Sequence, residues 1–193
     1  MSTVGAALFQ WVQAAPFYEA LHRDAVSKLE VGGGRRWLDV GCGPGLVARL
    51  AAAHGYDALG VDRDPDMIAA ARGSATARCR FEVGALADEG PSACVVSAAS
   101  LLYVLADPLD GMRHLWRRVH PGGALLVVET TDALTPARAT GVSPHPALLL
   151  WATTRRGRAV DRGLARAVDA TTVETHPLLD GLVEAWVLRK GDR

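Results

Sequence analysis

The sequence predicts an α/β fold in which a mostly parallel sheet carries helices on both faces, and three observations support this class. From Arg36 onward, apolar runs alternate with helical segments at the rhythm of βα units. The first apolar run ends in a turn with glycine at positions 41, 43 and 45, as expected where a strand leads into a helix beside a ligand. Two later β-rich runs flank Leu179-Asp180-Gly181, which predicts an antiparallel hairpin.

The individual elements follow in chain order. Expected strands span residues 36–41, 57–62, 79–83, 94–98 and 124–130, and expected helices span residues 44–54, 64–72 and 108–119. Pro44 suits the first turn of its helix, because the N–H that proline lacks would be unpaired there. The helix 108–119 follows Asp107, a capping residue, and ends before His120-Pro121-Gly122-Gly123. The hairpin strands are expected within residues 168–176 and 182–188.

Two segments lie outside this alternation. Residues 8–30 look helical and amphipathic, whereas residues 131–146 carry three prolines and a glycine and are expected to form an irregular loop. The ligand of an open α/β sheet lies beyond the carboxyl ends of its strands, and these segments are free to cover that edge. We therefore expect one domain over residues 1–193, with residues 1–30 as an N-terminal helical lid and residues 131–146 as a lid loop.

Composition narrows the range of partners. The 193 residues contain 21 Lys plus Arg and 21 Asp plus Glu, so the formal net charge is zero and neither nucleic acid nor an anionic membrane is expected as a partner. Residues 1–16 carry no Lys or Arg and so lack the positive region of a signal peptide. Three cysteines without close spacing favour neither a disulfide framework nor a zinc site. We expect a soluble, cytoplasmic protein, monomeric or homodimeric.

The glycine turn and the strand after it predict a nucleoside-like cofactor. Residues 37–45 read Trp-Leu-Asp-Val-Gly-Cys-Gly-Pro-Gly, and the alternate glycines leave a turn that a ligand can approach closely. Asp62 ends the next apolar strand, where its carboxylate can accept both hydrogen bonds of a ribose diol. A dinucleotide fingerprint needs Gly or Ala where this chain has Leu46, so a dinucleotide is disfavoured. A tight turn without a ligand, and an N-capping role for Asp62, are the alternatives.

These motifs resemble motif I and its surroundings in the class I S-adenosylmethionine-dependent methyltransferases, in the small-molecule, quinone-methyltransferase-like subgroup. The resemblance rests on residues 37–45 and 60–62, on Ala15-Pro16-Phe17-Tyr18, and on the runs 95–104 and 115–123. It implies a seven-stranded Rossmann-like sheet in the order 3-2-1-4-5-7-6, whose last strand pair is an antiparallel hairpin. It also implies S-adenosyl-L-methionine as cofactor and methyl transfer as the reaction.

The resemblance further implies which residues contact the cofactor. In this family the motif aspartate orients the methionine portion, the glycines pass close to it, and a tyrosine of the opening stretch lies beside it. The acid that ends the second strand holds the ribose, and the next residue packs on the adenine. On this chain the expected cofactor-binding set is Tyr18, Asp39, Gly41, Cys42, Gly43, Gly45, Asp62, Arg63, Ala85, Leu86 and Ser97.

One departure from the family pattern concerns the adenine. Where the family commonly shows Gly-Asp-Ala after the third strand, this chain reads Gly84-Ala85-Leu86, with no carboxylate before Asp88. The backbone N–H groups of Ala85 and Leu86 are expected to meet the adenine ring instead. We therefore expect reduced selectivity for adenine.

The expected acceptor site lies between Tyr18, Tyr103 and the loop that contains His145. Tyr103 and His145 are the candidate catalytic residues, because each can handle the proton of an acceptor. The strand end Ser97-Ala98-Ala99-Ser100 lacks the Asn/Asp-Pro-Pro-Tyr of nucleic-acid-base and amide N-methyltransferases and the metal-holding carboxylate of catechol-type enzymes. These features predict transfer to a small aromatic or apolar acceptor without a metal. A core role is the alternative for Tyr18.

Two other functions remain open at this point. The loss of the adenine aspartate at Ala85 favours a catalytically inactive S-adenosylmethionine-binding or regulatory protein. The same fold would also support a cofactor-assisted reaction without methyl transfer.

Four arginines, at positions 155, 158, 162 and 166, recur at steps of three and four residues. Such steps place side chains on one face of a helix. We interpret them as a solvated basic face, with a site for an acidic partner as the alternative.

Overall fold

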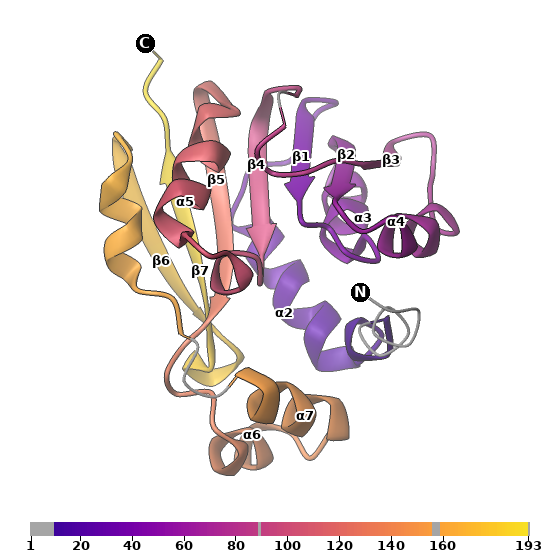
Figure 1. Cartoon of the computed structure of the whole chain (residues 1–193), viewed down its shortest axis with the longest axis vertical. Coiled ribbons are helices and arrows are strands. Elements are labelled where there is room, and N and C mark those ends of the chain that lie inside the picture. The colour runs from indigo at the N-terminus through magenta and orange to yellow at the C-terminus, as the bar shows by residue number, and fades with distance from the viewer. Residues whose placement is uncertain (1–9, 89, 156–158, 193) are drawn as a thin grey trace.

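A computed structural model describes residues 10–88, 90–155 and 159–192 of the chain. The strands are β1 (Arg36–Val40), β2 (Asp57–Asp62), β3 (Cys79–Val83), β4 (Ala93–Ala99), β5 (Val119–Thr130), β6 (Thr172–Leu178) and β7 (Val183–Arg189). They form one sheet in the order β3-β2-β1-β4-β5-β7-β6, in which β7 is antiparallel to both of its neighbours and the other pairs are parallel. The expected order and the closing hairpin are confirmed (Figure 1).

β5 begins earlier than expected. Val119 pairs with Ala93 of β4, and residues 120–123, which were expected to separate the helix from the strand, lie inside the strand. The register between β4 and β5 shifts between Ala93 and Val95, and Gly122 has a φ of 70°. Glycine allows this register shift to lie inside the strand. The strand therefore starts earlier than expected, and the preceding helix ends earlier than expected.

The helices are α2 (Pro16–Ser27), α3 (Leu46–Ala53), α4 (Pro65–Arg72), α5 (Pro108–Arg117), α6 (Pro136–Val142) and α7 (Pro146–Arg155), with 3₁₀ turns η1 (Leu102–Val104), η2 (Arg162–Ala167) and η3 (Leu179–Gly181). Asp107 caps α5 by accepting the Leu109 and Asp110 amides. The helix expected over residues 8–30 is found as a helical stretch at 10–13 and as α2, while residues 8 and 9 lie outside the described ranges. No helix in the described part of the chain is long and apolar enough to cross a bilayer.

The prediction of an irregular loop at residues 131–146 is wrong for the middle of this segment, which forms the helix α6. The hydroxyl of Thr135 accepts the Arg138 amide at 3.3 Å, and Pro136 takes the first helical position. This combination of cap and proline also starts α5, and it outweighs the interruption expected from Gly141.

Helices cover both faces of the sheet. On one face α2, α3 and α7 pack against a core that includes Trp37 and Leu126, and on the other α5 and η2 pack against a core that includes Val127 and Trp186. Figure 1 shows α2 beyond the arrow tips of β1 and β4, with α6 and α7 beyond the end of β5. These three helices therefore cover the carboxyl edge of the sheet, where ligands of open α/β sheets bind.

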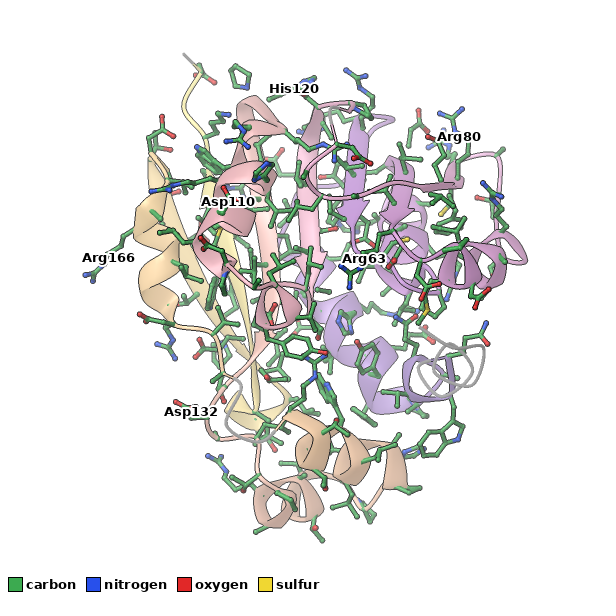
Figure 2. All side chains as sticks on the ribbon, viewed as in Figure 1. Arg63, Arg80, Asp110, His120, Asp132 and Arg166 are labelled. Atoms are coloured by element: carbon green, nitrogen blue, oxygen red, sulfur yellow. The ribbon has the colours of Figure 1, made fainter. Side chains whose placement is uncertain are left out.

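The prediction that four arginines form one basic helix face is wrong. α7 ends at Arg155, whose side chain is buried, while Arg162 and Arg166 belong to η2 and Arg158 lies outside the described residues. Arg166 points away from the molecule in Figure 2. Because the helix ends at the first arginine, the regular spacing that predicted one face is lost.

Candidate active site

The glycine turn after β1 has a backbone that side chains would obstruct. Gly41, Gly43 and Gly45 have φ angles of 69°, 52° and 86°. A Cβ on Gly45 would lie 2.4 Å from a ring carbon of Phe81, and one on Gly41 would lie 2.8 Å from Leu101 Cδ1. The turn therefore keeps bare backbone at the carboxyl edge, directly before α3.

Asp62, the last residue of β2, holds this turn in place. Its Oδ2 accepts the Gly43 amide at 2.8 Å, and its Oδ1 accepts the Asp64 amide at 2.9 Å. A carboxylate oxygen offers two lone pairs, so each oxygen can still accept a hydrogen bond from a ribose hydroxyl. The N-cap of α4 is Asp64, which accepts the Asp66 amide, so helix capping does not account for Asp62.

A buried chain of hydrogen bonds orients Asp39. The Trp37 Nε1–H donates to Ser97 Oγ at 2.8 Å, and the Ser97 hydroxyl donates to Asp39 Oδ1 at 2.7 Å. Asp39 is 1% exposed, and this burial raises its pKa to about 7 although Ser97 lowers it. Asp39 Oδ2 is buried without a hydrogen-bond partner among the described residues. Ser97, which was expected to contact the cofactor, thus commits its hydroxyl hydrogen to Asp39.

The loop after β3 differs from expectation. The Ala85 amide donates to Asp88 Oδ2 at 2.7 Å, so this amide is not free to meet an adenine ring. The same hydrogen bond brings a carboxylate to the loop in which the sequence lacks the expected aspartate. Leu86 packs against the core on the α5 face. Arg63 lies exposed after β2, on the side of the molecule where α2 lies (Figure 2).

The residues at the ends of β1 and β2 fit S-adenosylmethionine. Bare backbone in the turn leaves room for a ligand, and the Asp62 carboxylate matches a ribose diol. The unpartnered Asp39 oxygen suits the ammonium group of a methionine moiety. Cys42 is buried within the turn, and burial raises the pKa of its thiol, so it serves as a small core residue.

Beyond the carboxyl edge, α2 and α7 contribute to an aromatic cluster. The Tyr18 ring lies edge-on to Trp151, with centroids 5.2 Å apart. The Phe17 and His145 centroids are 5.7 Å apart, and those of Trp11 and His145 are 6.1 Å apart. Tyr18 and Trp151 are buried, so the accessible apolar wall of this cluster consists of the exposed Trp11 and the half-buried Phe17 and His145.

A polar cluster adjoins this wall. Arg155, at the end of α7, is 5% exposed and its guanidinium lies 3.2 Å from the Tyr103 ring centroid. Glu129, near the end of β5, is 2% exposed, and its Oε1 accepts the Leu102 amide at 2.8 Å. Burial raises the pKa of Tyr18 to about 12 and that of Glu129 to about 7, while the positive charge of Arg155 lowers both. Tyr18 therefore stays protonated at neutral pH, and its hydroxyl has the Ser100 side chain as a hydrogen-bond partner.

His145 lies just before α7, where it caps the helix. Its Nδ1 accepts the Ala147 amide at 3.2 Å. In the neutral ring Nε2 then carries the hydrogen, so His145 can donate a hydrogen bond from Nε2.

Sequence reasoning missed Glu129 and Arg155. Glu129 lies inside the apolar run of β5. Charged residues are rarely buried unless they have a partner, so this position indicates a buried, partnered carboxylate. Arg155 carries no comparable signal, since its spacing indicated a solvent-exposed helix face.

A protein-family model described as "Methyltransferase domain" matches residues 11–167 of the chain. The chain belongs to this family. This domain is of class I, and the cofactor of the family is S-adenosyl-L-methionine.

Individual relatives share part of the methyltransferase sequence. The ubiquinone biosynthesis O-methyltransferase of Methylococcus capsulatus is 33% identical over 99 residues, which are 48% of this chain and 42% of that protein. The ribosomal protein L11 methyltransferase of Ralstonia nicotianae is 39% identical over 100 residues, 49% of this chain and 32% of that protein. The chain spans less than half the length of these curated relatives. The crystal structure of magnesium protoporphyrin IX methyltransferase from Synechocystis PCC 6803 shares the fold, with a TM-score of 0.70 and 15% identity over 97% of this chain and 95% of that one.

Replacing the Asp62 carboxylate should weaken cofactor binding. Asp62→Ala removes the two carboxylate oxygens that are expected to accept the ribose hydroxyls, together with the restraint on Gly43, so we expect S-adenosylhomocysteine binding to weaken by about 1.5–3 kcal/mol. Titration calorimetry measures this loss. Asp57→Ala, at the exposed opposite end of β2, is the matched control and should bind normally. Unchanged affinity in a folded Asp62→Ala protein would contradict the role of Asp62.

Asp39 should make the stability of the cofactor-free protein fall as pH rises. Burial raises its pKa to about 7 from an ordinary 3.8, so between these values the folded state keeps a proton that the unfolded state releases. The free energy of unfolding should therefore fall on the order of 2 kcal/mol between pH 5 and pH 7 from this group. Denaturant unfolding at both pH values measures the slope.

In Asp39→Asn the side chain no longer titrates, so its contribution to the change of unfolding free energy with pH should disappear. Glu129 has a pKa near the same value and should account for the slope that remains. Asp57→Asn is the control and should keep the full slope. A wild-type slope in Asp39→Asn would show that this carboxyl is not protonated in the folded protein.

Proposed function

We propose that this methyltransferase transfers the methyl group to an oxygen of a small aromatic or apolar acceptor, without a metal ion. The observation that carries the proposal is the aromatic wall of α2 and α7 beside the polar cluster of Tyr18, Tyr103, Glu129 and Arg155. A flat acceptor can stack on the wall while its hydroxyl meets the tyrosines. The name of the relative from Methylococcus capsulatus, an O-methyltransferase of ubiquinone biosynthesis, supports an acceptor of this kind.

The proposed roles divide the site into a cofactor half and an acceptor half. Asp39, Asp62 and the glycine turn hold the cofactor, with Arg63 and the loop at residues 84–88 on the adenine side. The stretch 10–30 and the segment 131–146 with its helix α6 cover the acceptor as a lid. Water is thereby kept away from the reacting atoms, a main task of the protein in such a transfer.

S-adenosylmethionine, when bound, supplies an activated methyl group, so the chain needs mainly to orient the acceptor and handle its proton. We propose that Tyr103 Oη relays that proton: it receives the acceptor's hydrogen while its own hydroxyl hydrogen passes to water, so the products are the methyl ether, S-adenosylhomocysteine and a solvent proton. Arg155 fixes the ring by stacking on its face. Tyr18, with a pKa raised to about 12 by burial, stays a donor and orients the acceptor oxygen. His145 contributes an Nε2–H donor at the edge of the wall, because its Nδ1 is held by Ala147.

The two buried carboxylates nearest the site each have one oxygen engaged within the protein. Within the described ranges, no three His, Cys, Asp or Glu side chains are placed to hold a metal ion together. The Glu129 Oε1 is directed to the Leu102 amide, and Asp39 Oδ1 to Ser97. The carboxylates nearest the site are thus used for positioning.

The proposal predicts methyl transfer to phenols and quinols in a screen. Incubation with isotopically labelled S-adenosylmethionine and a panel of phenols, catechols and hydroquinones, followed by mass spectrometry, should yield a labelled methyl ether. Titration calorimetry with S-adenosylhomocysteine is run in parallel. Tight binding with no transfer to any acceptor would favour the regulatory alternative, and product formation only with added divalent metal would contradict the metal-free proposal.

Tyr103→Phe should separate chemistry from binding. Loss of the hydroxyl removes the proton-handling group, so we expect kcat to fall about 10²-fold, the lower range for general acid–base catalysis, while S-adenosylhomocysteine binds as before. Tyr56→Phe is the control, because its hydroxyl donates to the Glu30 carbonyl in a remote part of the molecule. A weakened cofactor affinity with normal turnover would place Tyr103 in the cofactor half instead.

His145→Asn should have a smaller effect of a different kind. The asparagine side-chain oxygen can still accept the Ala147 amide at the start of α7, whereas the Nε2–H donor is lost. We expect a higher KM for the acceptor and a kcat close to that of the wild type, measured by steady-state kinetics. A kcat loss as large as that of Tyr103→Phe, with KM unchanged, would instead assign the proton to His145.

A further inference from the structure

A cavity of about 470 Å³ lies at the end of β5, next to Glu129. Its volume falls within the range of small-molecule sites. The walls come from β5 and the loop after it, from the segment that leads into η2, and from β7. The charged and aromatic residues of its lining are Glu129, Asp132, Asp161, Arg162, Glu184 and Trp186.

The described part of the cavity lining has more acidic than basic side chains. Among the lining residues that the structure describes, four are acidic and one, Arg162, is basic. Arg162 is ion-paired with Glu184, so its charge is already matched. Asp161 Oδ1 accepts the Gly163 amide. Asp132 lies exposed on the loop after β5, at the end of the molecule where α6 lies (Figure 2).

Glu129 lies at the buried side of the cavity, with its carboxylate near the backbone amides of residues 101–103. Its Oε1 accepts the Leu102 amide, but its Oε2 is buried and has no hydrogen-bond partner among the described residues. Arg155 lies close enough for its charge to act on Glu129, although its guanidinium stacks on Tyr103. A buried carboxylate oxygen without a donor is costly, and a ligand that brings an N–H donor relieves that cost.

The lining suits an organic cation. Among the described residues, no three acidic, His or Cys side chains are placed to hold a metal ion together. An organic ammonium group donates up to three hydrogen bonds and needs no such cluster of ligands. Trp186 gives the same cavity an aromatic side, which suits the carbon skeleton of such a ligand.

We propose that this cavity binds the ammonium group of a small organic amine, held by Glu129 Oε2 and Asp132. A second step rests on the proposed function, namely that the amine is part of the methyl acceptor. Glu129 joins the cavity to the Leu102–Tyr103 turn. One molecule can therefore place its ammonium group in the cavity and its hydroxyl near Tyr103. The acceptor class is then an aromatic hydroxyl compound with an amine side chain.

The test compares tyramine with its neutral analogue 4-(2-hydroxyethyl)phenol, with S-adenosylhomocysteine present, by titration calorimetry. We expect the wild type to prefer tyramine by about tenfold or more, the factor that a charge-assisted hydrogen bond carries. Glu129→Gln keeps an oxygen for the Leu102 amide and replaces Oε2 by an amide donor, and Asp132→Asn removes the outer charge. Each should reduce the preference several-fold. Glu82→Gln, on the remote edge strand β3, is the matched control and should keep it.

The outcomes separate this inference from the proposed function. Equal binding of the two compounds by the wild type, or a preference that survives in both cavity variants, would overturn the ammonium site even if neutral phenols are methylated. Charge-dependent tyramine binding without methylation of any phenol would support the cavity and refute the proposed reaction. If tyramine binds but only neutral phenols are methylated, the amine is a separate ligand and its assignment to the acceptor is wrong. Circular dichroism of Glu129→Gln checks its fold, and Asp132→Asn, at an exposed position, provides the independent variant.

Discussion

The attachment of the glycine turn to the end of β2 is the constraint on which the cofactor site depends. The turn has positive φ angles and cannot pair as a strand, so its amides need other acceptors. The Val61 carbonyl accepts the amides of Gly41 and Cys42 at 2.8 and 3.0 Å, and Asp62 accepts that of Gly43. Three successive amides are thus held by two adjacent residues of β2. The carboxylate proposed to bind the ribose is the same group that shapes the turn, so the shape of the turn and the position of the ribose acceptor are coupled.

Two buried carboxylates lie on the strands to either side of β4, and their hydrogen bonding is alike. Asp39, on β1, uses one oxygen to accept a hydroxyl, and Glu129, on β5, uses one oxygen to accept an amide. The second oxygen of each is buried without a partner in the described part of the chain. Burial raises the pKa of both groups to about 7. Each group is therefore costly to keep charged in the free protein, and a ligand with a cationic donor recovers that cost.

The sequence was most informative where backbone geometry restricts the choice of residue. The glycine turn, the acid at the end of β2 and the hairpin around residues 179–181 each require particular residue types, so strands and helices near them were predicted within a few residues. The order of the strands came from the family resemblance, because hydrophobic patterns do not encode which strands are neighbours. The helix α6 was missed because its proline and glycine content was given more weight than its cap at Thr135.

The site was predictable only in part, because long-range contacts decide which side chains face it. Arg155 shows this most clearly: its spacing placed it on a solvated face, yet α7 ends at this residue and the guanidinium enters the site. Ser97 lies at the expected strand end, but its partner is Asp39, a residue 58 positions earlier. Asp88 returns to the Ala85 amide, a contact that depends on how a loop folds back. Each of these positions is set by tertiary packing rather than by local pattern.

α7 joins the apolar and the polar parts of the acceptor half. Its Trp151 packs edge-on against Tyr18, and its last residue, Arg155, stacks on Tyr103 and acts electrostatically on Glu129. His145 caps its start and belongs to the aromatic wall. A shift of this one helix would alter the wall that an acceptor stacks on and also the charge that lowers the Glu129 pKa. α7 therefore links two properties of the proposed acceptor site, whatever acceptor it takes. One is the apolar contact between the acceptor and the wall, and the other is the protonation of the polar cluster.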